Sequence, residues 1–225
     1  MDINNIILGT KLEVTRFDYN GEEKKPVYIS QLEEILDDGS VLIGTPIHEG
    51  KIIFIPNGSQ IKACFFHPTG LFAFEGEVIA REKRHGIFLL NVSISSSIEK
   101  IQRREYYRFD CLMPVKLKVV RVGETKVIAE DSPLTDSIIK DISGGGVGLI
   151  ANESYHLNDV IEMHFSLDGQ AVNTLGKVIR SNVFEQDARK FDVGIVFYEM
   201  SMKDRDKVIK FIFQRQSKLR QKGLV

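Results

Sequence analysis

The chain has 225 residues, of which 43% are hydrophobic and 27% are charged. This composition is typical of a folded globular protein and excludes an intrinsically disordered one. The length predicts two small domains, each with its own core. The formal net charge of −1 excludes a globally basic surface for duplex nucleic acid.

Charge is unevenly divided between the two halves of the chain. Residues 1–97 carry 9 Lys and Arg against 13 Asp and Glu, whereas residues 98–225 carry 21 against 18. An anionic ligand is therefore expected to bind the second half. Cys64 and Cys111 have neither metal-ligand nor redox spacing, which predicts reduced thiols. No basic leader precedes a long apolar run, so we expect a cytoplasmic protein without membrane insertion.

The first half reads as short β-strands separated by turn residues. Glycine, proline and aspartate mark turns at 37–40 and 56–58, and a charged loop is expected at 81–86. No stretch keeps a helical period, so a small antiparallel β-barrel is predicted. The expected strands are 11–19, 26–36, 41–44, 52–55, 61–66, 70–80 and 87–92.

The second half repeats this pattern. Residues 93–100 are polar and small, which indicates a linker or the edge of the second domain. Residues 122–133 are polar and are expected to form a hairpin connection. Six segments alternate apolar and polar residues, and their spacing predicts a second barrel. These segments are 107–120, 136–142, 147–151, 160–167, 172–183 and 191–198.

One helix is expected, at residues 202–222. Ser201 and Asp204 form an acidic variant of the capping box, and Gly223 stands where a C-cap glycine belongs. Val208, Phe211 and Ile212 share one face, so the early turns are expected to pack on the barrel. The basic last turns suit the helix dipole, and a contact with an acidic partner surface is the alternative.

Three arginines within six residues, Arg103, Arg104 and Arg108, follow the polar segment 93–100. Arg104 and Arg108 are four residues apart, a spacing that places both side chains on one face of a helix or a strand. Two guanidinium groups on one face can grip phosphates, pair with the edge of guanine or stack on a base. The alternative is a solvated basic turn that pairs with Glu99 and Glu105.

A glycine run, DISGGGVG at 141–148, carries the second candidate group. Asp141 and Ser143 are two residues apart at a strand end, so both side chains would meet a ligand together. Gly144, Gly145 and Gly146 remove neighbouring side chains and allow close approach of a flat ring or a phosphate. The alternative is an Asx-type turn that needs positive φ.

Other chemistries find little support in the sequence. The glycine run continues as a strand, so it is neither a P-loop nor a dinucleotide fingerprint, both of which precede a helix. Five histidines are dispersed without metal-ligand spacing, and no nucleophile elbow is present. We therefore expect no enzyme activity, no metal and no cofactor. Arg180 is a further ligand candidate among barrel-face residues, with an ordinary surface arginine as its alternative.

The pattern RRxxxR at 103–108, followed by DxSxxG at 141–146 within a β-barrel, resembles the PilZ domain family. The resemblance implies a six-stranded barrel from about residue 98 onward that binds cyclic di-GMP. It implies that Arg104 and Arg108 hold phosphate and guanine, that Asp141 and Ser143 contact guanine, and that Gly146 completes the motif. An arginine at position 103 is associated in that family with an intercalated ligand dimer.

The order and length of the first half resemble the N-terminal split barrel of the flagellar-brake subgroup of PilZ proteins. The expected domains are therefore 1–97, a flagellar-brake-type barrel, and 98–225, a PilZ domain with a C-terminal helix. This resemblance implies a bacterial effector that changes its domain arrangement on ligand binding. A flagellar motor or stator protein is the implied partner, and motility the implied output, with exopolysaccharide or biofilm control as an alternative output.

Two hypotheses from other classes remain. The first barrel could be a flavin-using split-barrel enzyme that the second regulates. The chain could also bind single-stranded nucleic acid through stacking on aromatic side chains, although the acidic first half speaks against a nucleic-acid partner. The aromatic candidates for stacking, which could equally be core residues, are Phe54, Phe65, Phe66, Phe72 and Phe74.

Overall fold

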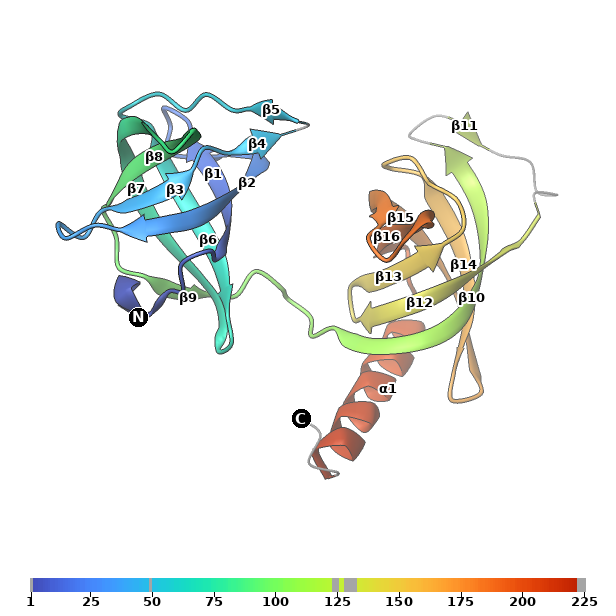
Figure 1. The fold of residues 1–225 in the computed structure, drawn as a ribbon. Coiled ribbons are helices and arrows are strands. Elements are labelled where there is room, and N and C mark those ends of the chain that lie inside the picture. The colour runs from blue at the N-terminus through green and yellow to red at the C-terminus, as the bar shows by residue number, and fades with distance from the viewer. Residues whose placement is uncertain (1, 49, 123–125, 128–132, 222–225) are drawn as a thin grey trace. The chain divides into compact units, whose positions relative to one another are not determined.

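The computed structural model describes residues 2–48, 50–122, 126–127 and 133–221 (Figure 1). The chain forms two compact units, Met1–Arg103 and Arg104–Val225. Each unit has its own hydrophobic core. Within the described ranges, no helix is long and apolar enough to cross a membrane.

The first unit is a closed six-stranded antiparallel barrel (Figure 1). Its strands, in spatial order, are β1 (Lys11–Phe17), β6 (Gln60–His67), β7 (Gly70–Arg84), β8 (Ile87–Ile94), β3 (Val41–Gly44) and β2 (Glu23–Ile35). Pairing of β2 with β1 closes the barrel. Three short strands and one turn of 3-10 helix are added to it: β4 (Ile47–His48), β5 (Lys51–Ile52), β9 (Glu99–Ile101) and η1 (Ile3–Asn5).

Alternation along the strands places apolar side chains inside this barrel. In β6, Ile61, Ala63 and Phe65 are buried, whereas Phe66 is exposed. Phe72 and Phe74 of β7 are buried in the same core, and Phe54 is exposed. Three of the five phenylalanines considered for stacking on nucleic acid therefore serve as core residues.

The structure differs from the sequence prediction at three places in this unit. Strand β7 continues through Arg84, so the charged stretch expected as a loop is strand, and only His85 and Gly86, both with positive φ, turn the chain. Of the strand expected at 52–55, only Ile52 is paired, within β5. Strand β2 begins at Glu23 and contains Pro26, which lies beside a register shift in the β1–β2 ladder.

The segment expected as a linker belongs to the first unit. Ser93 and Ile94 complete β8, the side chain of Ile98 is buried in the first core, and β9 pairs with β7. The first compact unit accordingly runs through Arg103.

The second unit is also a closed six-stranded antiparallel barrel (Figure 1). Its strands, in spatial order, are β10 (Phe109–Val122), β12 (Thr135–Ser143), β13 (Gly146–Ala151), β16 (Asp187–Tyr198), β15 (Gln170–Phe184) and β14 (Val160–Leu167). Pairing of β14 with β10 closes it, and β11 (Lys126–Val127) pairs with the end of β10. Most of the connection expected at 122–133 lies outside the described residues.

Turn residues set the register of this barrel. Asp168 and Gly169 both have positive φ and join β14 to β15 in a two-residue hairpin, with Leu167 opposite Gln170. The buried side chains of β14, among them Ile161, Met163 and Phe165, point into the core. The predicted barrel with aspartate-glycine punctuation is confirmed.

Helix α1 (Met202–Gln221) packs on the second barrel with its early turns. Val208, Phe211 and Ile212 are buried, and the ring of Phe211 meets that of Phe109 edge-on at 6.1 Å. The Ser201 hydroxyl accepts the Asp204 amide at 3.1 Å and donates to the Asp204 carboxylate at 2.8 Å, which confirms the acidic capping box. The predicted C-cap, Gly223, lies outside the described residues.

Candidate functional site

A row of in-register residues crosses four neighbouring strands on the outer face of the second barrel. Asp141 of β12 lies opposite Gly148 of β13, Gly148 opposite Gly194 of β16, and Gly194 opposite Arg180 of β15. Their neighbours along the strands, such as Ile142, Leu149 and Val193, point into the core, so the row faces outward. A carboxylate and a guanidinium thus end a stretch that carries no side chains.

The two central glycines differ in the space around them. A Cβ at Gly148 would overlap the Asp141 carboxylate, which lies across that position. A Cβ at Gly194 would lie 3.5 Å from the Cβ of Arg180 and 3.6 Å from a side-chain carbon of Ile179, which is ordinary contact. Gly148 and Gly194, which we call the glycine floor, therefore form a strip without side chains of its own, in which the Asp141 carboxylate lies over Gly148 and a planar group can approach backbone at Gly194.

Two carboxylates gather at the β12 end of the glycine floor. Asp110 of β10 lies directly opposite Asp141. Like charges at such positions destabilise a sheet, and groups that donate hydrogen bonds or carry positive charge offset the cost. The half-buried Cys111 thiol beside them has its pKa raised to about 11 by burial and by the charges of Asp141 and Asp110. It therefore stays a neutral thiol at physiological pH.

Arg104 and Arg108 lie on the segment that enters β10, and both side chains are exposed. Arg108 directly precedes Phe109, the first residue of β10, which pairs with Ile142 of β12. Neither arginine forms an ion pair within the described ranges. The segment that carries these two exposed guanidinium groups leads directly into β10, the neighbour of the strand that holds Asp141 and Ser143.

Tyr106, which lies between these arginines, holds the segment in place. Its ring covers the Gly144–Gly145 turn, where a Cβ at Gly144 would overlap the ring and one at Gly145 would lie 3.1 Å from it. Its hydroxyl accepts a hydrogen bond from Arg205 of α1 at 3.3 Å. The glycine run thus accommodates an aromatic ring of this chain.

Ser143 and Gly146 shape the turn. The Ser143 hydroxyl donates to the Gly146 carbonyl at 3.2 Å and accepts from the Gly145 amide at 3.3 Å. A Cβ at Gly146 would overlap the Ile195 carbonyl oxygen of the neighbouring strand. None of Gly144, Gly145 and Gly146 has positive φ, so these glycines allow close approach of neighbouring groups, and the alternative of a turn that needs positive φ is wrong.

Comparisons with known proteins agree with this geometry. The model of the PilZ domain matches residues 102–214, and that of the flagellar protein YcgR matches residues 8–94. The first match covers half of the chain and contains both arginines and the glycine floor. The chain belongs to the PilZ family.

Solved structures share the fold of the whole chain. The Bacillus subtilis inhibitor of motility, MotI, is 17% identical, with 95% of this chain and 99% of that chain covered and a TM-score of 0.75. Escherichia coli YcgR in complex with c-di-GMP is 16% identical, with 96% and 87% covered and a TM-score of 0.50. No curated protein sequence matches.

Two further candidate arginines lie in ion pairs. Arg180 of the PilZ domain donates to Asp192 at 2.9 Å, and Lys140 pairs with the other oxygen of Asp192 at 2.8 Å. Arg103, the last residue of the first unit, is held within that unit by Glu13 at 2.5 Å, which raises its pKa, and its guanidinium lies 5.6 Å from the centre of the Phe66 ring.

The PilZ motif accounts for part of the site, and four residues were missed. Tyr106, Arg205, Gly148 and Gly194 become visible only when strands from distant parts of the chain pair. The regular alternation around Gly194, with Val193 and Ile195 on the core side, was the only sequence signal for its outward position. Within the described ranges, no group of His, Cys, Asp and Glu could hold a metal ion.

Proposed function

We propose that the chain is a cyclic di-GMP receptor and that the glycine floor, together with Arg104 and Arg108, is its nucleotide site. The observation that carries this proposal is the outward row of Asp141, Gly148, Gly194 and Arg180. A flat floor with an acceptor at one end suits guanine, whose N1–H and N2–H₂ groups donate to a carboxylate. The remaining charge of the ligand lies on two phosphates.

Arg104 and Arg108 take the phosphates or stack on the second base. A guanidinium group binds phosphate through two parallel hydrogen bonds and also stacks on planar rings. Both groups are exposed and have no carboxylate partner among the described residues, so binding does not first break an ion pair. The residues proposed for the site are Arg103, Arg104, Arg108, Asp141, Ser143, Gly146 and Arg180.

These residues contribute in different ways. Asp141, Arg104 and Arg108 contact the ligand directly. Ser143 and Gly146 hold the turn, and Gly146 allows β13 to approach β16. Arg180 bounds the floor and stays paired with Asp192. Arg103 joins the ligand only after it leaves Glu13, and this exchange governs whether one ligand or an intercalated pair is held.

The output that we propose is control of flagellar motility through a protein partner, a motor or stator component. The match of residues 8–94 to the flagellar protein YcgR and the fold shared with an inhibitor of motility support it. A binding site without a reactive group suits a regulator and not an enzyme. We further propose that ligand binding changes the arrangement of the two domains, because the arginines lie where one compact unit ends and the next begins.

Titration calorimetry tests the nucleotide site. We expect cyclic di-GMP to bind and cyclic di-AMP, which lacks the N1–H and N2–H₂ donors, to bind at least tenfold more weakly. Arg104→Ala or Arg108→Ala should weaken binding by about 30-fold or more, since each leaves a phosphate without its charged donors. Arg189→Ala, at an exposed arginine that pairs only with Asp187, is the matched control.

Unchanged affinity in both Arg104→Ala and Arg108→Ala would exclude the site. Small-angle scattering with and without cyclic di-GMP tests the domain rearrangement separately. Identical scattering curves at saturating ligand would remove the rearrangement and leave the binding proposal intact.

A further inference from the structure

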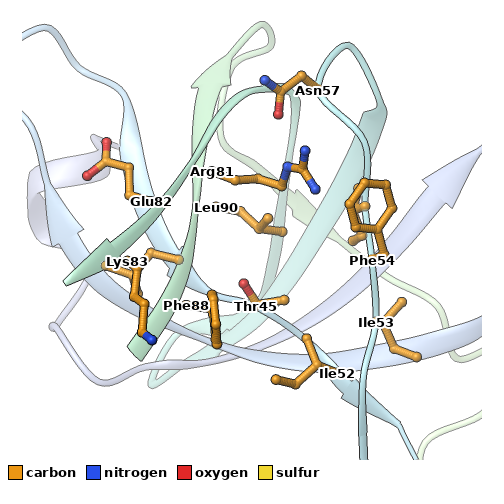
Figure 2. A pocket seen from close by; sticks show the side chains of 12 residues that line it. Thr45, Ile52, Ile53, Phe54, Asn57, Arg81, Glu82, Lys83, Phe88 and Leu90 are labelled. Atoms are coloured by element: carbon orange, nitrogen blue, oxygen red, sulfur yellow. The ribbon is translucent and has the colours of Figure 1, made fainter. Parts of the chain in front are cut away.

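A cleft of about 600 Å³ opens on the first barrel, and none of the residues proposed for the nucleotide lines it (Figure 2). One wall is the segment Ile52–Phe54 and the other is the end of the β7–β8 hairpin, with Arg81, Lys83 and Phe88 (Figure 2). A second hollow of about 470 Å³ shares Thr45, Ile52 and Phe88 with it. Because they share these residues, the two hollows are adjacent, and we refer to them together as the groove.

Both walls of the cleft have unpaired strand edges. Strand β6 pairs with β7 only as far as Glu77, whereas β8 pairs with the other edge of β7 through Arg84. The stretch from Ala80 to Arg84 is therefore bonded to a neighbouring strand on one edge only. Opposite it, β5 is the last strand in the sheet order and Ile53–Ile55 belong to no described strand. Unpaired edges of this kind accept an added strand.

The groove is apolar, and its side chains are exposed. Ile52, Phe54 and Phe88 show 58%, 63% and 48% of their surface, and the neighbours Ile47 and Ile87 show 56% and 55%. Such a concentration of exposed apolar residues on one face marks an interaction surface. The buried side chain of Leu90 forms part of the floor of the cleft.

Two cations without carboxylate partners line this apolar surface. The Arg81 guanidinium lies 4.2 Å from the centre of the Phe54 ring, and the Lys83 ammonium 5.0 Å from that of Phe88. Neither forms an ion pair with a described residue, whereas Arg84, on the other face of β7, pairs with Glu34 and Glu82 at 2.7 Å each. Unpaired cations are notable because this half of the chain carries more acidic than basic residues.

We propose that this cleft binds an extended acidic segment of a partner protein, which adds as a β-strand between the edges of β7 and β5. Its backbone pairs with the free edges, alternate apolar side chains enter the groove, and its carboxylates meet Arg81 and Lys83. A strand edge recognises peptide backbone, which a small amphipathic anion lacks. The proposal rests on the proposed function only in giving the regulator a protein partner.

The test uses fluorescein-labelled octapeptides and the full chain in the absence of cyclic di-GMP. The probe alternates Glu or Asp with Val or Phe. One comparison peptide has Lys at every acidic position, and another is N-methylated at alternate residues and cannot pair as a strand. Fluorescence anisotropy should show binding of the acidic probe and at least tenfold weaker binding of both comparison peptides.

A charge exchange sharpens the result. The double variant Arg81→Glu with Lys83→Glu should bind the acidic probe at least tenfold more weakly and the Lys peptide more tightly than the original chain does. Lys24→Glu, at an exposed lysine near the start of β2, is the matched control. It should change neither the affinity for the acidic probe nor the affinity for the Lys peptide. Amide shifts on addition of the probe should lie in residues 52–55 and 80–88.

Absence of binding by the acidic probe at millimolar concentration, or equal binding of the acidic and Lys peptides, would overturn the proposal. Binding of dodecanoate to the cleft without binding of the probe would also overturn it and would assign the cleft to a small amphipathic anion. Calorimetry with cyclic di-GMP on the same variants tests the nucleotide site separately. Because Arg81 and Lys83 belong to the first unit, the variants should bind cyclic di-GMP as the original chain does, whether or not the peptide binds.

Discussion

The two barrels have the same number of strands and the same closed antiparallel form, yet they expose different chemistry. The second presents glycine, carboxylate and guanidinium groups on the site face, with the exposed side chain of Ile179 beside Gly194. The first exposes Ile52, Phe54 and Phe88 around Arg81 and Lys83, two cations that form no ion pair with any residue that the structure describes. The fold therefore fixes where strands lie, and the outward residues determine what each barrel can recognise.

The two barrels also differ in how the backbone of their strand edges is paired. In the second barrel β12, β13 and β16 are paired on both edges along the row, so recognition there depends on side chains and on the glycine floor, and only the end of β15 beyond Lys177 is paired with a single strand, β16. In the first, β5 and the end of β7 leave backbone groups unpaired. We infer that the second barrel suits a small planar ligand and the first an extended polypeptide.

The largest expected effect is a loss of stability in the second barrel alone. Gly146→Ala should lower the free energy of unfolding of the second barrel by about 3 kcal/mol, because the added Cβ overlaps the Ile195 carbonyl oxygen. Chemical denaturation should then show the second barrel unfolding first. Gly194→Ala, which meets only ordinary contacts, is the control, and equal midpoints for the two variants would contradict this account.

Removal of the Tyr106 ring should uncouple the arginine segment from the glycine turn. Tyr106→Ala is expected to weaken cyclic di-GMP binding by about tenfold or more in calorimetry, since Arg104 and Arg108 lose their support. Tyr106→Phe keeps the ring and loses only the hydrogen bond from Arg205, so it should bind within about threefold of the original chain. Equal losses in both variants would show that the ring does not position the segment.

Filling the glycine floor should affect binding more than folding. Gly194→Val places a branched side chain where a planar base is proposed to lie, and we expect about tenfold weaker cyclic di-GMP binding. The denaturation midpoint of the variant should stay close to that of Gly194→Ala. Full affinity in a folded Gly194→Val protein would exclude the floor as the nucleotide surface.

The smallest expected effect concerns Arg103. Glu13→Gln removes the ion pair that holds this side chain in the first unit, so the guanidinium becomes available without cost. Because partly exposed pairs contribute only up to about 1 kcal/mol, the affinity for cyclic di-GMP should rise about two- to fivefold. Glu23→Gln, which breaks the pair with Lys62, is the comparison, and an unchanged affinity in Glu13→Gln would mean that Arg103 takes no part.

The sequence predicted two barrels and a terminal helix because alternation and turn residues are local signals. The RRxxxR and DxSxxG patterns likewise predicted a PilZ domain, which the family model matches at residues 102–214. The glycine floor could not be predicted, since Gly148 and Gly194 meet only through the register of β13 with β16. The charged end of β7 was predicted as a loop because its residues are Arg, Glu and Lys. It is a strand, paired on one edge only, and such a strand tolerates charged residues.

The glycine floor has a consequence for how long the second barrel survives in a cell. Asp141, Gly148, Gly194 and Arg180 come from four strands, and an unfolded chain cannot bring them together. A nucleotide that spans this row binds the native state alone, so it stabilises the barrel by about 2.7 kcal/mol at a concentration 100-fold above its Kd. Loss of the messenger would thus expose the domain to proteolysis and shorten the lifetime of the receptor, in addition to ending the signal.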